Sequence, residues 1–232
     1  MSFRVTTKVP PRKDRPVRPL PRLALAVALI AAPIAALLAV ASAASAAPAP
    51  AATHTRIAVV RPVHADGTPV AGYTVHREHI DGFTCLDASP VAVDANIDFC
   101  GFSATYTMAC WKSKNHTVLC LRDPWSKDLA RIRYSGTFAK HAAPRHPMPQ
   151  ALRLMDGNRC WVRGGGAWPE VTGHPHWFGT YGCHTGAVYG RGDGINESVQ
   201  PWRVHVVENA SMPNQKITVH RVRKAFFVGT AH

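Results

Sequence analysis

The chain has 232 residues and a formal net charge of +13, from 27 lysines and arginines against 14 aspartates and glutamates. The first 46 residues hold seven basic side chains and one acidic one, which leaves a net charge of +7 on the remaining 186 residues. That moderate positive charge favours contact with anionic envelope polymers or lipid headgroups over nucleic acid, and the length suffices for one domain or two small ones.

The amino terminus has the pattern of a secretory signal peptide over residues 1–46. A basic stretch is followed by 24 uncharged residues from Leu23 to Ala46, which end in Ala-Ser-Ala steps at 41–43 and 44–46. We place cleavage after Ala46. The alternative is an uncleaved anchor, because the apolar run is long enough to span a bilayer, but Pro33 and the Ala-Ser-Ala steps favour cleavage. Either way we expect export to the cell envelope or the extracellular space, with membrane contact only through an uncleaved segment.

Short strands are predicted throughout the rest of the chain. Residues 47–55 are rich in alanine and proline and are expected to form a disordered lead-in. After them, short β-rich runs alternate with turn residues, and no helical period lasts longer than about two turns. The predicted strands are 56–60, 71–78, 104–111, 116–122, 129–134, 151–155, 187–190, 202–208, 216–222 and 224–231. The expected fold class is all-β and mainly antiparallel, a disulfide-stabilised sandwich or barrel.

Two short matches indicate two similar small β units. Asp-Gly-x-x-Cys occurs at 81–85 and again at 156–160, and Pro-Trp occurs at 124–125 and again at 201–202. We therefore predict a first β unit over 56–140 and a second over 151–232. The segment 141–150 is the predicted linker, since its prolines and histidines give no core pattern. The two matches have different offsets, so the repeat is a hypothesis.

The cysteines predict three disulfides. An even number of cysteines in an exported chain is typical of a disulfide framework, and this chain has six. Six cysteines allow fifteen pairings, of which we favour the nearest-neighbour set: Cys85–Cys100, Cys110–Cys120 and Cys160–Cys183. Its basis is a predicted hairpin turn at 112–115, which would bring Cys110 and Cys120 together. No cysteine pair has the short spacing of a structural zinc site, and we expect no metal and no cofactor.

Several sequence motifs resemble those of a known group of proteins. The motifs are DGxxC, GGAW, GHPxW and GTYxC, followed by GIN, QPW and the final FFVGTA, with VLCLRDPW in the first half. They resemble a set of small exported, disulfide-containing proteins of high-GC Gram-positive bacteria. The resemblance spans roughly residues 81–231. It implies export and the disulfides, and it carries no activity and no functional residues to this chain.

No catalytic residue is predicted. With every cysteine bridged, none can act as a nucleophile, and GFSAT at 101–105 lacks the final glycine of a nucleophile elbow. The glycines at 164–166 lack the rest of a phosphate-binding loop. His174 and His176 could share a metal with His184, but Pro175 lies between the first two, and surface histidines are the preferred interpretation.

Aromatic residues concentrate between Cys160 and Cys183. One interpretation is a small core packed against that disulfide, because large aromatic side chains usually serve burial first. The other is a platform that faces a sugar or a lipid, since loops often carry binding function. The candidate ligand-binding residues under this second interpretation are Trp168, Trp177, Phe178 and Tyr181.

The sequence therefore predicts an exported, non-enzymatic, envelope-associated binding or structural protein. Its expected partners are anionic or carbohydrate envelope polymers, and nucleic acid is not among them. The alternative is a secreted hydrolase that acts on envelope material, with a carboxylate or histidine cluster assembled from distant segments. A histidine beside an acid and a hydroxyl would favour the hydrolase, and an aromatic, basic surface would favour binding.

Overall fold

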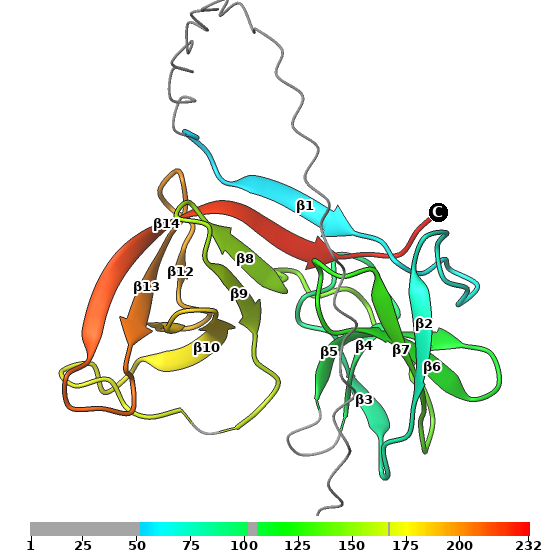
Figure 1. Ribbon diagram of the computed structural model, residues 1–232. Helices are drawn as coiled ribbons and strands as arrows, with labels where there is room; N and C mark the ends of the chain where they lie inside the picture. Colours follow the sequence, from blue (N-terminus) through cyan, green and yellow to red (C-terminus); the bar gives the residue numbers. More distant parts are fainter. Residues whose placement is uncertain (1–51, 102–105, 167) are drawn as a thin grey trace, which may run out of the picture. The chain divides into compact units, whose positions relative to one another are not determined.

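A computed structural model of the protein describes residues 52–101, 106–166 and 168–232 (Figure 1). The expected signal peptide, residues 1–46, lies outside the described residues. The predicted all-β, disulfide-stabilised fold is confirmed: the described residues form fourteen strands and three disulfides. No helix in this part of the chain is long and apolar enough to cross a membrane.

The strands form two sheets (Figure 1). The first has eight strands, in the order β1 (Arg56–Val60), β14 (Lys216–Val228), β8 (Ala151–Leu154), β9 (Arg159–Val162), β10 (Phe178–Cys183), β11 (Ala187–Gly190), β13 (Arg203–Glu208) and β12 (Ile195–Asn196). The second has six, in the order β2 (Thr74–Glu78), β7 (Asp128–Arg133), β6 (Thr117–Leu121), β5 (Thr107–Ser113), β4 (Ile97–Gly101) and β3 (Thr84–Ala88).

The long strand β14 closes the first sheet into a barrel. Its first half pairs with β13, from Glu208 opposite Lys216 onward, and its second half pairs with β8. Six strands therefore close on themselves: β8, β9, β10, β11, β13 and β14. The sequence predicted two strands, 216–222 and 224–231, where the structure has one. A shift in register between Val222 and Lys224 keeps the strand continuous while its apolar alternation changes phase.

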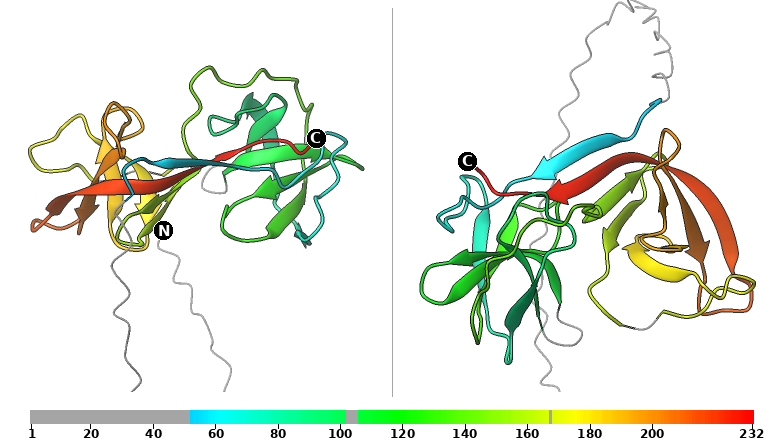
Figure 2. Two further views of the ribbon diagram at one scale, coloured as in Figure 1. Left: turned by 90° about the horizontal axis from the view of Figure 1, so that it is seen from above. Right: turned by 180° about the vertical axis from the view of Figure 1, so that it is seen from behind.

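Strand β1 belongs to the first sheet, although the sequence analysis assigned residues 56–60 to the first β unit. It runs parallel to the end of β14, with Arg56 opposite Lys224, and the two strands lie side by side in every view (Figures 1 and 2). Thr55, expected at the end of a disordered lead-in, is instead buried. Its hydroxyl donates to the carbonyl of Val222 at 2.7 Å and accepts from the amide of Trp202 at 2.8 Å. These bonds fix the entry of the chain into β1.

The second sheet bends back on itself. The amide of Ser135, just after β7, donates to the carbonyl of Phe83 at 2.8 Å, which brings the end of β7 to the start of β3. Strand β2 adds to β7 in parallel. The sequence analysis did not predict β3, β4, β9, β10 or β12. Cysteines, glycines and turn residues interrupt the apolar alternation in these short strands, so the local pattern is weak.

The disulfides join the three pairs that the nearest-neighbour expectation named. In each pair the two cysteines are direct partners on adjacent antiparallel strands: β3 with β4, β5 with β6, and β9 with β10. The matching sequence motifs also occupy matching places, because each Asp-Gly turn precedes a strand whose cysteine bridges to the next strand, and each Pro-Trp precedes β7 or β13.

One hydrophobic cluster contains side chains from both sheets. Leu119, Leu121 and Leu129 of the second sheet share it with Leu152 and Val204 of the first. A smaller cluster inside the second sheet surrounds two of the disulfides and includes Phe83 and Ile132. The predicted linker is bonded into this assembly, since Met148 donates its amide to Pro90 and Gln150 donates its amide to Phe226.

Asp98 is a charged residue in the core of the second sheet. It is fully buried on β4, and neither carboxylate oxygen has a hydrogen-bond partner among the described residues. Desolvation raises the pKa of Asp98 to about 6, with His141 opposing the shift and Asp87 adding to it. Because the pKa of Asp98 is higher in the folded protein than in the unfolded chain, protonation of this carboxyl stabilises the fold. This stabilisation is complete below about pH 4 and is lost as the pH rises through 6.

We predict that the substitution Asp98→Asn reduces the pH dependence of stability. Between pH 4 and pH 7.5, the free energy of unfolding of the wild type should fall relative to that of the variant, by at most about 3 kcal/mol. Urea denaturation of both proteins across this range measures the difference. If the free energies of unfolding of the two proteins changed with pH in the same way, ionisation of Asp98 would not destabilise the fold.

Candidate functional site

Tyr181, one of the four candidate ligand-binding residues, lies in the core and not at the surface. Its side chain is fully buried in the shared core, and its hydroxyl donates to the carbonyl of Pro149 at 2.9 Å. Burial raises the pKa of this phenol well above its usual value. The sequence placed Tyr181 among the platform candidates because loops often carry binding function, but its position on β10 points its side chain into the core.

Trp168 is packed rather than displayed. It joins a small cluster with Tyr189 and Val207, and its ring meets that of Tyr189 edge-on with 5.4 Å between centroids. The ring also lies against the backbone of Gly179, where any Cβ atom would overlap it. The glycine in Phe-Gly-Thr therefore makes room for an indole.

Trp177 belongs to the same cluster and lies between two histidines. Its ring centroid is 3.9 Å from that of His174 and 4.7 Å from that of His205. Burial, and then the charge of His174, lower the pKa of His205.

The third histidine of the metal site considered from the sequence, His184, lies beside Trp161 and not beside Trp177. In the described part of the chain, no group of three or more metal-ligating side chains is placed to hold an ion.

Phe178 differs from the other three candidates because 65% of its surface is exposed. The four residues therefore form no common platform. Trp168 and Trp177 share a packed cluster, Tyr181 is in the core, and Phe178 faces solvent. The segment between Cys160 and Cys183 therefore carries both packed and exposed aromatic side chains.

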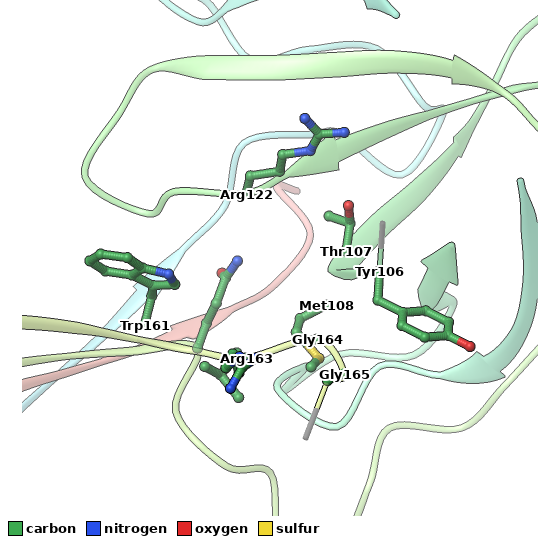
Figure 3. A pocket seen from close by; sticks show the side chains of 11 residues that line it. Tyr106, Thr107, Met108, Arg122, Trp161, Arg163, Gly164 and Gly165 are labelled. Atoms are coloured by element: carbon green, nitrogen blue, oxygen red, sulfur yellow. The ribbon is translucent and has the colours of Figure 1, made fainter. Parts of the chain in front are cut away.

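A different aromatic surface forms around Trp161. Two cavities, of about 320 and 360 Å³, share Arg122 and Trp161 as lining residues, and we call them together the Trp161 groove. The first is also lined by Tyr106, Thr107, Met108, Gln150, Val162, Arg163 and Gly164–Gly166, and the second by Asp123, Trp125, Arg159 and His184. In Figure 3, Trp161 and Tyr106 stand on opposite sides of the first cavity, with Arg122 and Arg163 between them.

Three aromatic side chains contribute to the groove. Trp161 is 40% exposed, an unusual value for an indole, and its ring meets that of His184 edge-on. Tyr106 is also exposed and stacks on Phe99 with 4.7 Å between centroids. Trp125 is half-buried against Phe226. These contacts fix the orientation of each ring, so the faces that remain open are preorganised.

Three arginines accompany the aromatic rings. Arg122 pairs with Glu78 at 2.7 Å, Arg159 lies over the ring of Trp125, and Arg163 lies 4.0 Å from the centroid of Trp168. Of the described residues that line the groove, Asp123 alone is acidic, and its carboxylate accepts a hydrogen bond from the amide of Trp125 at 2.8 Å. The groove is therefore aromatic and basic.

The run of three glycines shapes one wall of the groove. A Cβ atom on Gly164 would lie 2.8 Å from the Cβ of Tyr106 and 2.9 Å from its carbonyl oxygen, so only glycine allows this approach. Gly166 has a φ of +86°, and a side chain there would meet the guanidinium of Arg163. The glycines thus make room for the groove residues Tyr106 and Arg163.

Gln150 joins the two sheets beside the groove. Its backbone N–H donates to the carbonyl of Phe226 on β14, and its backbone carbonyl accepts from the amide of Val162 on β9. Both strands belong to the first sheet. Its side-chain Nε2 donates to the carbonyl of Leu121, on the second sheet, at 2.9 Å. The residue lies in the segment that the sequence analysis regarded as a linker without a core pattern.

One histidine lies between an acid and a hydroxyl. His220 Nδ1 is 2.8 Å from Asp156 Oδ2, and its Nε2 is 2.8 Å from Thr218 Oγ1. His220 and Asp156 line a cavity of about 330 Å³, but Thr218 is not among its described lining residues. This is the arrangement that the sequence analysis gave as favouring a hydrolase, and its two contacts link β14 to the turn between β8 and β9.

Comparison of the chain with protein-family models, with curated proteins and with solved structures finds no match.

We predict that Trp177 and Phe178 differ sharply when replaced by alanine. Trp177→Ala should lower the free energy of unfolding by roughly 2–3 kcal/mol, because it removes a ring packed in a cluster. Phe178→Ala should change it by less than about 0.5 kcal/mol, because that ring faces solvent. Denaturant unfolding of the two variants measures both values. Equal losses would mean that the loop packs differently.

Proposed function

We propose that the protein is an exported binding protein of the cell envelope, which holds an anionic or carbohydrate polymer in the Trp161 groove. The observation that carries the proposal is that aromatic rings and guanidinium groups line that groove together. Aromatic faces pack against the apolar faces of sugar rings, and guanidinium groups bind carboxylates and phosphates with two parallel hydrogen bonds.

The disulfides support the extracytoplasmic part of the proposal. All six cysteines are bridged, an arrangement that suits an oxidising compartment outside the cytoplasm. The basic and apolar pattern of residues 1–46 supports export by a secretory signal peptide. The excess of basic side chains beyond residue 46 would draw the exported chain toward anionic envelope material.

The groove geometry supports binding of an extended chain. Its two cavities share Arg122 and Trp161 as lining residues, so a polymer that occupied both would lie beside the exposed indole. The one acidic group among its described lining residues, Asp123, is engaged by a backbone amide in a turn. These features favour a binding protein over the alternative, a secreted hydrolase that acts on envelope material.

We predict that Trp161→Ala weakens the binding of purified cell-wall material about tenfold at moderate salt. The reason is the loss of one stacking face, which is worth roughly 1–1.5 kcal/mol. Co-sedimentation of the disulfide-bonded protein with cell-wall material across a salt series measures the effect. Phe178→Ala is the matched control, because it removes an exposed aromatic ring outside the groove.

Wild-type binding that persists at high salt and is lost only in Trp161→Ala would support the groove. Binding that disappears with salt to the same degree in all three proteins would reduce the interaction to net charge. Equal binding by Trp161→Ala and the wild type at every salt concentration would place the binding surface elsewhere.

A further inference from the structure

Four basic side chains form a row across four neighbouring strands of the first sheet (Figure 1). Arg56 of β1 lies opposite Lys224 of β14, and Lys224 lies opposite Arg153 of β8. Arg153 in turn lies opposite Arg159 of β9. Residues directly opposite each other in a sheet point to the same face, so the four side chains share one face. We call this row the basic ladder.

The burial pattern agrees with a shared outer face. Arg153 and Arg159 are exposed, while the residues next to them on their strands, Leu152 and Cys160, are fully buried. Arg56 is also exposed, and Lys224 is half-buried. Three strand spacings separate the two ends of the basic ladder, so its length is about 14 Å.

The basic ladder carries four like charges without a carboxylate. Within the part of the chain that the structure describes, none of its side chains forms an ion pair. Lys224 lies instead over the ring of Phe226, 4.7 Å from its centroid, and Arg159 lies over the ring of Trp125 at 5.5 Å. Like charges directly opposite each other destabilise a sheet, so a bound anion would relieve the repulsion.

On one side of the basic ladder, the next row of the same face is uncharged. Two residues further along each strand, the register places Ala58 beside Phe226, Phe226 beside Ala151, and Ala151 beside Trp161. The positive charge is therefore arranged along a line. A line of charge complements an anionic chain better than it complements the plane of a membrane.

The separation of charges and rings indicates the kind of anionic chain. The basic ladder contains no aromatic residue, and the exposed ring of Trp161 stands in the next row. A uronic-acid polymer carries its carboxylates on the sugar rings, whereas a phosphodiester polymer carries its charge in the links between units. Guanidinium groups bind phosphates with two parallel hydrogen bonds. These features favour a chain with a phosphodiester backbone.

We propose that the basic ladder binds a linear envelope polymer whose units are joined by phosphodiesters. The phosphates face the arginines of the ladder, and the polymer continues at Arg159, which also lines the second cavity of the Trp161 groove. This inference rests on the proposed function, because it names the chemistry of the polymer and adds a second contact surface for it.

The experiment is a calorimetric titration of the disulfide-bonded protein with three probes at moderate salt. These are poly(glycerol phosphate), polygalacturonate with the same number of charges, and vesicles of phosphatidylglycerol. We expect poly(glycerol phosphate) to bind at least about fivefold more tightly than polygalacturonate, since its phosphates can follow the ladder without a ring between them. The vesicles should bind more weakly per accessible charge than poly(glycerol phosphate).

Arg153→Gln removes one charge from the middle of the basic ladder and leaves the groove intact, because Arg153 lines neither cavity. Binding of poly(glycerol phosphate) should weaken about fivefold and depend less steeply on salt, since one fewer phosphate releases its counterion. The melting temperature without polymer should stay the same or rise, because a like-charge contact is lost. A purely structural role of Arg153 would lower it.

Arg133→Gln is the matched control. Arg133 is exposed at the end of β7, in the second sheet, and forms no ion pair with the described residues. The control variant therefore has the same net charge as Arg153→Gln. Its binding of poly(glycerol phosphate) should weaken by less than about twofold, because a distant exposed charge is screened by salt.

Equal losses in Arg153→Gln and Arg133→Gln would overturn the inference, because net charge alone would then drive binding. Polygalacturonate or vesicles that bound as tightly as poly(glycerol phosphate) would overturn it too, and so would no binding of poly(glycerol phosphate). If cell-wall material still sedimented with the protein in a Trp161-dependent way, the proposed function would stand without the basic ladder. If that sedimentation also failed, both proposals would fall.

Discussion

The Trp161 groove depends on one buried amide residue, Gln150. Its backbone bonds hold it between β9 and β14 of the first sheet, and its side chain reaches the carbonyl of Leu121 at the end of β6 in the second. Arg122 and Trp125 follow Leu121 along the chain, while Trp161 and Arg163 flank Val162. The same residue therefore fixes the register between the two halves of the groove.

The rest of the fold supports that junction. Strand β14 closes the first sheet through β13 and β8, and near its end Phe226 contacts both Gln150 and Trp125. The disulfide between Cys160 and Cys183 ties β9, which carries Trp161, to β10. Short strands joined by disulfides provide a rigid support for exposed rings, so little conformational entropy is lost when a ligand meets them.

The fold class and the disulfides were accessible from the sequence because both rest on local patterns. Strand-like runs with frequent turns indicated an all-β protein, and the hairpin around 112–115 suggested which cysteines are neighbours. The closure by β14 was not accessible, because a register shift inside the strand looks like a break between two strands. The position of β1 was missed since its partner lies more than 160 residues away along the chain.

The groove could not be found from sequence for a similar reason. Tyr106, Arg122 and Trp125 come from the first half and Trp161 from the second, and no local pattern joins them. The aromatic cluster between the last two cysteines drew attention to Trp168 and Trp177, yet packing against Tyr189, Gly179 and two histidines engages those rings. The composition of the sequence pointed to aromatic side chains as candidate ligand contacts. Which of these rings remain exposed depends on the tertiary structure.

We propose that an envelope polymer contacts the protein at Trp161. The most direct measurement follows the six tryptophan indole N–H signals by ¹⁵N–¹H correlation spectroscopy as solubilised cell-wall glycan is added. Our account predicts that the signals of Trp161 and Trp125 shift or broaden first, while those of Trp168 and Trp177 stay in place. Shifts confined to Trp168 and Trp177, or no shift at any indole when the glycan binds, would contradict it.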